Sequence, residues 1–235
     1  MQRLAIVRAK ITNRDSIAGD VDFLASIDCV QSSILLSQAY YYGLGVEQST
    51  ERAMTELEKW SNSNQPLISY IAAELVIQEY GDQQKELIEE LLIRSSNLGY
   101  IKAQLKLIEL YEDGAILQES PYRVVEYARK AALQGHPDGL LVLALCYIRG
   151  YGVNINKNKG KELLVMAADR GNTDAIEIIN QIKKCVTKIY LILFLSAQKI
   201  LVKARRLIIY GKIPIISNHS SYLNILKVED RWIIK

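Results

Sequence analysis

Two short Gly-x-Gly segments contain the first residues whose types could do chemistry. "AYYYGLGV" at 39–46 and "CYIRGYGV" at 146–153 share Tyr, two residues, Gly, one residue, Gly and Val. Glycines at this spacing can admit a phosphate, but dinucleotide-binding loops follow a strand, open a helix and carry a third glycine. Here the glycines end a helix-like segment, and Gln48 stands where the third would be. We interpret both segments as turns, and we expect no cofactor and no small-molecule substrate.

The cysteines and histidines offer little further chemistry. Cys29, Cys146 and Cys185 form no C-x-x-C pair, and neither His136 nor His219 has metal-ligand spacing with a cysteine or a carboxylate. We therefore predict no metal site, no disulfide framework and no catalytic residues. The competing enzyme hypothesis is a repeat-built hydrolase with Cys185 and His219 as a nucleophile pair, because such partners meet in space rather than in sequence.

Charge divides the chain into two parts. The net charge is only +3, but residues 178–235 carry +9 and residues 1–177 carry −6, with no Asp or Glu between Asn180 and Val228. This asymmetry indicates a boundary near Asn180. It argues against nucleic-acid binding by residues 1–177 and leaves only the basic tail as a candidate.

A repeat of about 36 residues organises the first part. Stepping from Tyr40 by 36, 35 and 36 residues reaches Val76, Tyr111 and Tyr147. Two further columns keep the same register: Asn64, Gly99, Gly135 and Gly171, and Gly45, Gly81 and Gly152. Periods of this length are typical of solenoids.

Each unit predicts two helices. The stretch 137–150 places Leu140, Leu143, Ala144 and Tyr147 on one helical face, and its Gly-x-Gly then ends the helix. A second helix is predicted over 120–135, with Ser120 as N-cap, Pro121 at the first position and Gly135 at the end.

These columns resemble the Sel1-like repeat family, relatives of the tetratricopeptide repeats. Residues 138–175 match its pattern best, residues 37–64 and 101–137 match in part, and residues 66–100 are worn, with Val76 in place of Tyr and Glu79 in place of the first Gly. The best unit carries these family residues: Ala144, Tyr147, Gly150, Gly152, Val153, Ala167, Ala168, Gly171, Asn172 and Ala175. Gly160 stands where the family has an alanine, so the resemblance predicts a late start for the second helix of this unit.

The resemblance implies an all-α solenoid of antiparallel helix pairs, bacterial in style, that binds a protein or peptide partner on its concave surface and is not an enzyme. A narrower version is an adaptor or an immunity protein that inhibits a cognate secreted effector. We divide the chain into an N-terminal helix or cap at 1–27, about four repeats at 28–184, and a basic capping helix with a short β-rich tail at 185–235. The tail residues 213–235 are rich in Ile, Val, Tyr and Trp around turn-prone "SNHSS", which is typical of a hairpin.

Partner-binding residues are expected on the first helices of the repeats, at polar positions outside the columns, together with nearby aromatic residues. The predicted set is Tyr41, Tyr42, Gln104, Lys106, Glu109, Glu112, Arg149 and Tyr151.

The basic segment 183–212 allows two interpretations. A stripe from Val186 to Ile208 predicts a closing helix packed on the last repeat, whereas the basic residues would suit contact with a membrane surface of anionic lipid. Lys188 and Lys199 interrupt the apolar run, which argues against a spanning helix.

The first fourteen residues, "MQRLAIVRAKITNR", contain an apolar run of only four, too short for a signal peptide. We therefore expect a cytoplasmic protein, or a periplasmic or secreted one if the N-terminus is incomplete.

Overall fold

The computed structural model describes residues 2–209, and every regular element in that range is a helix, as predicted. The chain divides into two compact units, Met1–Ile179 and Asn180–Lys235, which are described separately. The predicted hairpin at 213–235 lies outside the described residues. The α-helices are α1 (Gln2–Thr12), α2 (Val21–Ala25), α3 (Val30–Tyr42), α4 (Thr50–Glu58), α5 (Pro66–Tyr80), α6 (Lys85–Asn97), α7 (Ile101–Asp113), α8 (Pro121–Leu133), α9 (Pro137–Arg149), α10 (Lys157–Asp169) and α11 (Thr173–Ile209), with 3₁₀ turns at Ala18–Asp20 and Gly81–Gln84.

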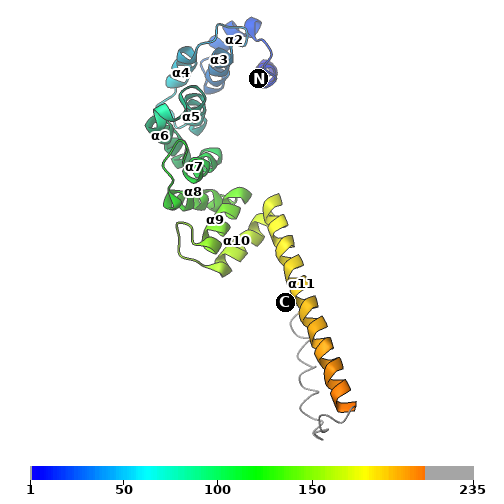
Figure 1. Ribbon diagram of the computed structural model, residues 1–235. Coiled ribbons are helices and arrows are strands. Elements are labelled where there is room, and N and C mark those ends of the chain that lie inside the picture. The colour runs from blue at the N-terminus through cyan, green and yellow to red at the C-terminus, as the bar shows by residue number, and fades with distance from the viewer. Residues whose placement is uncertain (1, 210–235) are drawn as a thin grey trace. The chain divides into compact units, whose positions relative to one another are not determined.

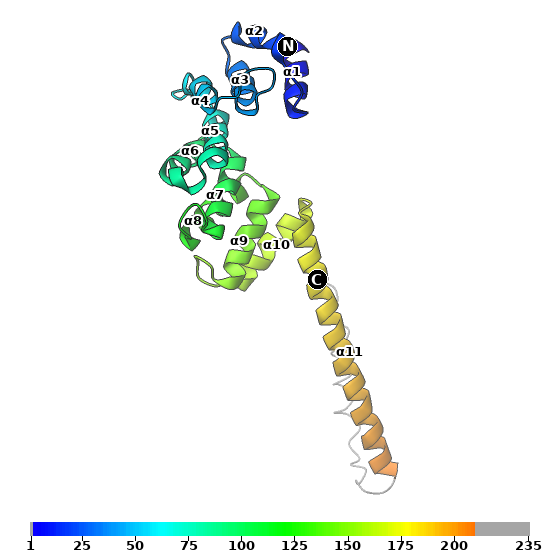
Figure 2. The same ribbon diagram turned by 45° about the horizontal axis from the view of Figure 1, so that its top comes forward.

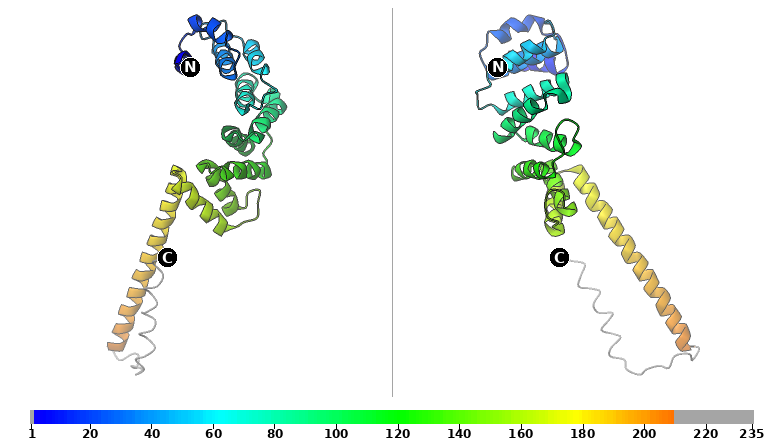
Figure 3. Two further views of the ribbon diagram at one scale, coloured as in Figure 1. Left: turned by 180° about the vertical axis from the view of Figure 1, so that it is seen from behind. Right: turned by 60° about the vertical axis from the view of Figure 1, so that its left-hand side comes forward.

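Four helix pairs, α3/α4, α5/α6, α7/α8 and α9/α10, form the first unit's repeats. Most close packing joins helices that are neighbours in sequence, such as α7 with α8 and α8 with α9. In Figure 1, α3, α5 and α7 follow the inner side of a curve, and α4 and α6 follow its outer side. The view from behind in Figure 3 shows the same order. First helices therefore line the inner surface, which is where a solenoid binds.

Small and apolar residues hold the pairs together. Ala131 and Ala167 are fully buried where second helices end, so adjacent helices approach closely. In the worn unit Ser95 takes this place, and its Oγ donates to the carbonyl of Pro66 at 2.7 Å. The column residue Tyr111 is 4% exposed, and its ring stacks on Tyr127 with centroids 6.1 Å apart. The tyrosine column thus contributes to packing: Val76 and Tyr111 are buried, and Tyr40 and Tyr147 are half-buried.

The Gly-x-Gly segments are turns that also bring backbones into contact. Gly150 ends α9 in the left-handed conformation, with φ of 77°. Gly152 has φ of 68°, and a Cβ built on it would lie 2.2 Å from the carbonyl oxygen of Pro121, at the start of α8. Gly43 and Gly45 repeat this arrangement in the first repeat, where the backbone of Gly45 approaches that of Ala18. No space for a phosphate is left at the second glycine.

Helix starts differ from the expectations in two places. Ser120 occupies the N-cap position of α8, but its side chain makes no capping hydrogen bond. The prediction of a late start for α10 is wrong: Asn156 caps it by accepting from the backbone N–H of Lys159 at 3.0 Å, so Gly160 lies inside the helix. There a Cβ would lie 2.5 Å from Cγ1 of Ile148, and the glycine lets α10 pack tightly on α9.

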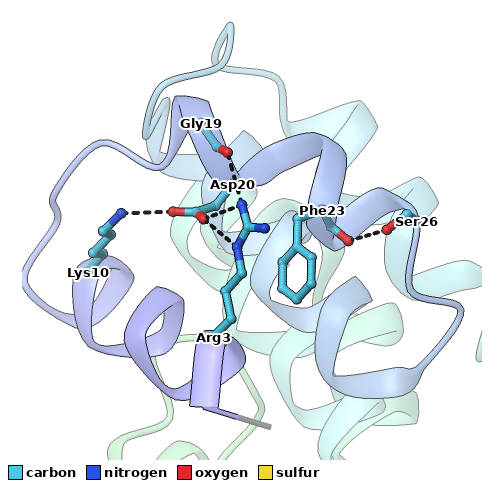
Figure 4. A network of polar contacts seen from close by, with 6 residues as sticks. All are labelled: Arg3, Lys10, Gly19, Asp20, Phe23 and Ser26. Carbon is cyan, nitrogen blue, oxygen red and sulfur yellow. Dashed lines mark hydrogen bonds and ion pairs between the residues drawn. The ribbon is translucent and has the colours of Figure 1, made fainter.

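An ion-pair network closes the N-terminal end, where α1, the turn Ala18–Asp20 and α2 precede the first repeat (Figure 4). The nearly buried Asp20 accepts from Arg3 Nε and Nη2 at 3.1 and 3.0 Å and from Lys10 Nζ at 2.8 Å. The Arg3 guanidinium also lies 4.1 Å from the ring centre of Phe23. Hydrogen bonds from Lys10 and Arg3 hold the pKa of Asp20 below its usual value.

Helix α11 is continuous from Thr173 to Ile209, so no break separates the last repeat from the predicted capping helix. Side chains from Val186 to Val202 are largely exposed, and the packing of this stripe on the last repeat stays a prediction. Among the described residues, Thr173–Lys203 is the one stretch long and apolar enough to cross a membrane.

We predict that Gly152→Ala destabilises the first unit more than Gly171→Ala does. Both glycines have positive φ, but nothing lies within 4 Å of a Cβ at Gly171. That control should cost about 1–2 kcal/mol for the backbone conformation alone, while crowding against Pro121 should add about 1–3 kcal/mol at Gly152. Urea unfolding measures the free energy of unfolding of both variants. Equal losses would contradict the prediction, because they would show that the contact between residue 152 and Pro121 accommodates a Cβ at no cost.

The Asp20 network should make stability depend on pH. Because the pKa of Asp20 is lowered in the folded chain, its charge stabilises the fold above the unfolded value of about 4, and this stabilisation disappears as pH falls through the folded value. Asp20→Asn should therefore lower the melting temperature at neutral pH, and the difference from the wild type should shrink in acid. A difference that stays constant with pH would contradict a role for the charge.

Candidate partner-binding groove

A groove runs between α7 and α9, the first helices of the third and fourth repeats. On α7 the lining positions are 105, 108, 109 and 112, and on α9 they are 138, 141, 142, 145 and 149. Both sets follow the three-and-four spacing of one helical face. Helix α8 packs on both α7 and α9 (Figure 2). The repeat period thus places two first-helix faces side by side.

The groove consists of two adjoining hollows. The first, of about 500 Å³, has an apolar floor of Leu105, Ile108 and Val142. The second, of about 550 Å³, lies toward the C-terminal end of α9. Glu112 and Val142 line both hollows, which makes them one continuous depression. The second hollow's remaining residues are Leu141, Leu145, Cys146, Arg149, Gly150 and Tyr151.

The rim of the groove is acidic. Glu109, Glu112, Asp113 and Asp138 line it, and Arg149 is the one basic side chain among the lining residues. Burial raises the pKa of the Glu112 carboxyl, and the Arg149 guanidinium opposes that shift. Asp138 is fixed by Asn172, whose Nδ2 donates to Oδ1 at 2.7 Å. Such a rim favours cationic groups.

Two titratable groups at the second hollow are kept neutral. Burial raises the pKa of the Cys146 thiol to about 11, so the thiolate needed for nucleophilic chemistry is scarce at neutral pH. Burial and the Glu119 carboxylate raise the pKa of Tyr151 to about 12. The Tyr151 hydroxyl donates to Glu119 Oε1 at 3.0 Å and presents its ring to the groove. The arrangement suits binding rather than reaction.

The structure brings four of the eight predicted binding residues together: Glu109, Glu112, Arg149 and Tyr151 all line this groove. Lys106 lies beside it and pairs with Glu109, with Nζ and Oε1 3.0 Å apart. These placements agree with the expected surface, and their role in binding stays a prediction.

Gln104 does not belong to a binding surface. It is 2% exposed, donates from Nε2 to the carbonyl of Ser96 at 3.3 Å, and accepts from Gln134 Nε2 at 3.0 Å. The prediction that it faces a partner is wrong because a polar side chain outside the column pattern can still be buried when neighbouring helices supply its hydrogen bonds.

Tyr41 and Tyr42 lie at the end of α3, in the first repeat. Their rings meet edge to face at 5.0 Å, and the Arg14 guanidinium lies 4.9 Å from the centre of the Tyr42 ring. Tyr42 is 37% exposed, whereas Tyr41 is partly covered. The structure therefore separates these two from the α7/α9 groove.

Sequence reasoning missed Asp113, Asp138 and the apolar floor. Asp138 follows Pro137 in the first turn of α9, where an acidic residue is expected simply because it stabilises the helix N-terminus. Leu105 and Val142 look like core positions in the repeat pattern. Only the helical spacing of Leu105 with Glu109 and Glu112 could have indicated a shared face.

The remaining candidates for catalysis find no partners in the described chain. Between residues 2 and 209, no group of three or more His, Cys, Asp or Glu could hold a metal ion. Cys185 is exposed on α11, and its proposed partner His219 lies outside the described residues.

Three segments of the chain match a known repeat family. Residues 30–55, 101–136 and 137–172 match the family model of the Sel1 repeat, and the worn pair α5/α6 falls between the first two matches. The chain is similar to a Sel1 repeat protein from Oxalobacter formigenes, with a TM-score of 0.53, 18% identity, and 69% of this chain and 66% of that chain covered. It is also similar to c5321, a protective antigen of uropathogenic Escherichia coli with an SLR fold, with a TM-score of 0.55, 26% identity, and 68% and 35% covered.

The match therefore spans slightly less than two thirds of the Oxalobacter protein and about a third of the antigen. The sequence comparison with curated proteins found no significant match.

Cys146 should react slowly with thiol reagents. In a Cys29→Ser/Cys185→Ser background, the modification rate at neutral pH should be far below that of a free cysteine, and it should rise about tenfold per pH unit below its pKa of about 11. Stopped-flow measurement with a disulfide reagent checks this. Fast modification at neutral pH would contradict the burial of this thiol and would mean that it is activated.

Proposed function

We propose that this chain, whose residues 30–55, 101–136 and 137–172 match the model of the Sel1 repeat, holds a protein or peptide partner in the α7/α9 groove. Sel1 repeat proteins generally serve as protein-interaction scaffolds. The observation that carries this proposal is the combination of an apolar floor with an acidic rim on two adjacent first helices. Interfaces with a hydrophobic centre and a polar edge are the common form of specific protein recognition.

The groove indicates the kind of partner. A segment with apolar side chains would cover Leu105, Val142 and Leu145, and lysine or arginine side chains would reach Glu109 and Glu112. Burial of the apolar groups would supply most of the affinity, and the rim charges would set orientation and association rate. The groove is open, so an extended or helical segment of a larger protein fits better than an enclosed small molecule.

Inhibition of a cognate effector is a narrower form of the same proposal. It predicts one stoichiometric partner, whereas an adaptor would capture several. Affinity capture followed by mass spectrometry separates these two forms.

Charge reversal in the groove should abolish partner capture. Glu109→Lys/Glu112→Lys places two cations where the rim is acidic, which should repel a basic segment and reduce capture at least tenfold. Both residues are exposed, and neighbours cover the Glu112 carboxyl only in part, so the melting temperature should change little.

The matched control is Glu58→Lys/Glu90→Lys, which makes the same change on exposed positions of α4 and α6. The control should bind as the wild type does. Quantitative mass spectrometry compares the wild type, the groove variant and the control. Equal capture by all three would contradict binding of the partner in this groove.

A further inference from the structure

The middle of α11 carries apolar side chains that no described residue of the second unit covers. Between residues 186 and 202, eleven large apolar side chains are 44% to 69% exposed: Val186, Ile189, Tyr190, Leu191, Ile192, Leu193, Phe194, Leu195, Ile200, Leu201 and Val202. Exposed apolar surface of this extent marks an interaction site.

The apolar side chains point in every direction around the helix. At 100° per residue, Leu193 and Ile200 share one side, while Phe194 and Leu201 lie about 100° further round. Ile192 and Leu195 lie on the remaining side, between Lys188 and Lys199. A helix that is apolar all round belongs either in a protein core or in a bilayer.

The length and the ends fit a bilayer. Residues 185–202 form a helix about 27 Å long, against a hydrocarbon thickness of about 30 Å. Lys183 and Lys184 precede the segment and Lys203 follows it, with Arg205 and Arg206 next in the sequence, and no Asp or Glu occurs between Asn180 and Val228. Both ends therefore suit anionic headgroups.

We propose that residues 185–202 span a lipid bilayer and anchor the repeat array to it, with the flanking basic residues at the headgroups. Lys188 and Lys199 lie three residues inside the two ends. Their long side chains can reach the nearest headgroups while their methylene groups stay in hydrocarbon. Between them, Ile189–Gln198 contains no charged residue.

Two other occupants explain less of this surface. A helix lying in the interface needs a continuous polar face, whereas Ile192 and Leu195 interrupt the side that holds Lys188 and Lys199. A coiled coil with a second copy buries one stripe, here Val186, Tyr190, Leu193, Ala197 and Ile200. That pairing would leave Leu191, Phe194 and Leu195 exposed to water.

The test is reconstitution of the full chain with lipid. The chain, purified in mild detergent, is mixed with vesicles of phosphatidylcholine and phosphatidylserine, the detergent is removed, and the vesicles are floated at low salt, at about 1 M salt and after alkaline carbonate. The anchored chain should float under all three conditions, because insertion depends on apolar burial rather than on screened charge.

A matched pair of variants tests whether the apolar side chains of residues 185–202 are needed for insertion. Leu193→Glu/Phe194→Glu puts two carboxylates at the midpoint of the segment and should abolish salt-resistant flotation. Leu133→Glu/Tyr122→Glu makes the same change at exposed apolar positions of the first unit, 82% and 72% exposed, and should float like the wild type.

Release at high salt would overturn the proposal in favour of surface adsorption by the basic residues, as would release by carbonate alone. A chain that stays out of the vesicles, whether as a monomer or as a dimer by light scattering, would also overturn it.

Discussion

The structure of the repeat array depends on one constraint: a two-helix unit cannot bury its own apolar face and must stack on its neighbours. Close stacking requires small side chains where helices meet and glycine where backbones meet. Ala131 and Ala167 satisfy the first requirement, and Gly152, pressed against the start of α8, satisfies the second. The groove follows from the same constraint. Because α8 packs on both α7 and α9, the two first helices present adjacent faces with a depression between them.

The ends of the chain meet this constraint in different ways. The N-terminal end is closed by α1, α2 and the loop between them, whose apolar residues Val7, Leu24 and Ile17 are buried with residues of α3. Asp20 ties Arg3 and Lys10 to the turn before α2. At the other end, Ala175, Ile178 and Ile179 at the start of α11 pack on the last repeat. Beyond them α11 exposes apolar surface that a bilayer would cover.

Much of the fold could be predicted from the sequence, because the columns are set by local requirements that each unit repeats. A tyrosine that fills a gap and a glycine that ends a helix recur every 36 residues, so their roles are readable from spacing alone. Gly160 could not be read in this way: the absence of a side chain weakens a helix in isolation, but here it serves the contact with Ile148. The groove was only partly predictable. Glu109 and Arg149 were identified as polar positions on first helices, while Gln104 looked the same and is buried by partners from other helices.

Hydrogen exchange on the chain with and without its captured partner is the most direct test of binding in the α7/α9 groove, since it locates the contact without altering a residue. A partner bound in the groove should slow exchange in α7, α9 and the Gly150–Gly152 turn and leave α4 and α6 unchanged. Protection confined to the second helices, or to α3 with no change in α7 and α9, would contradict it.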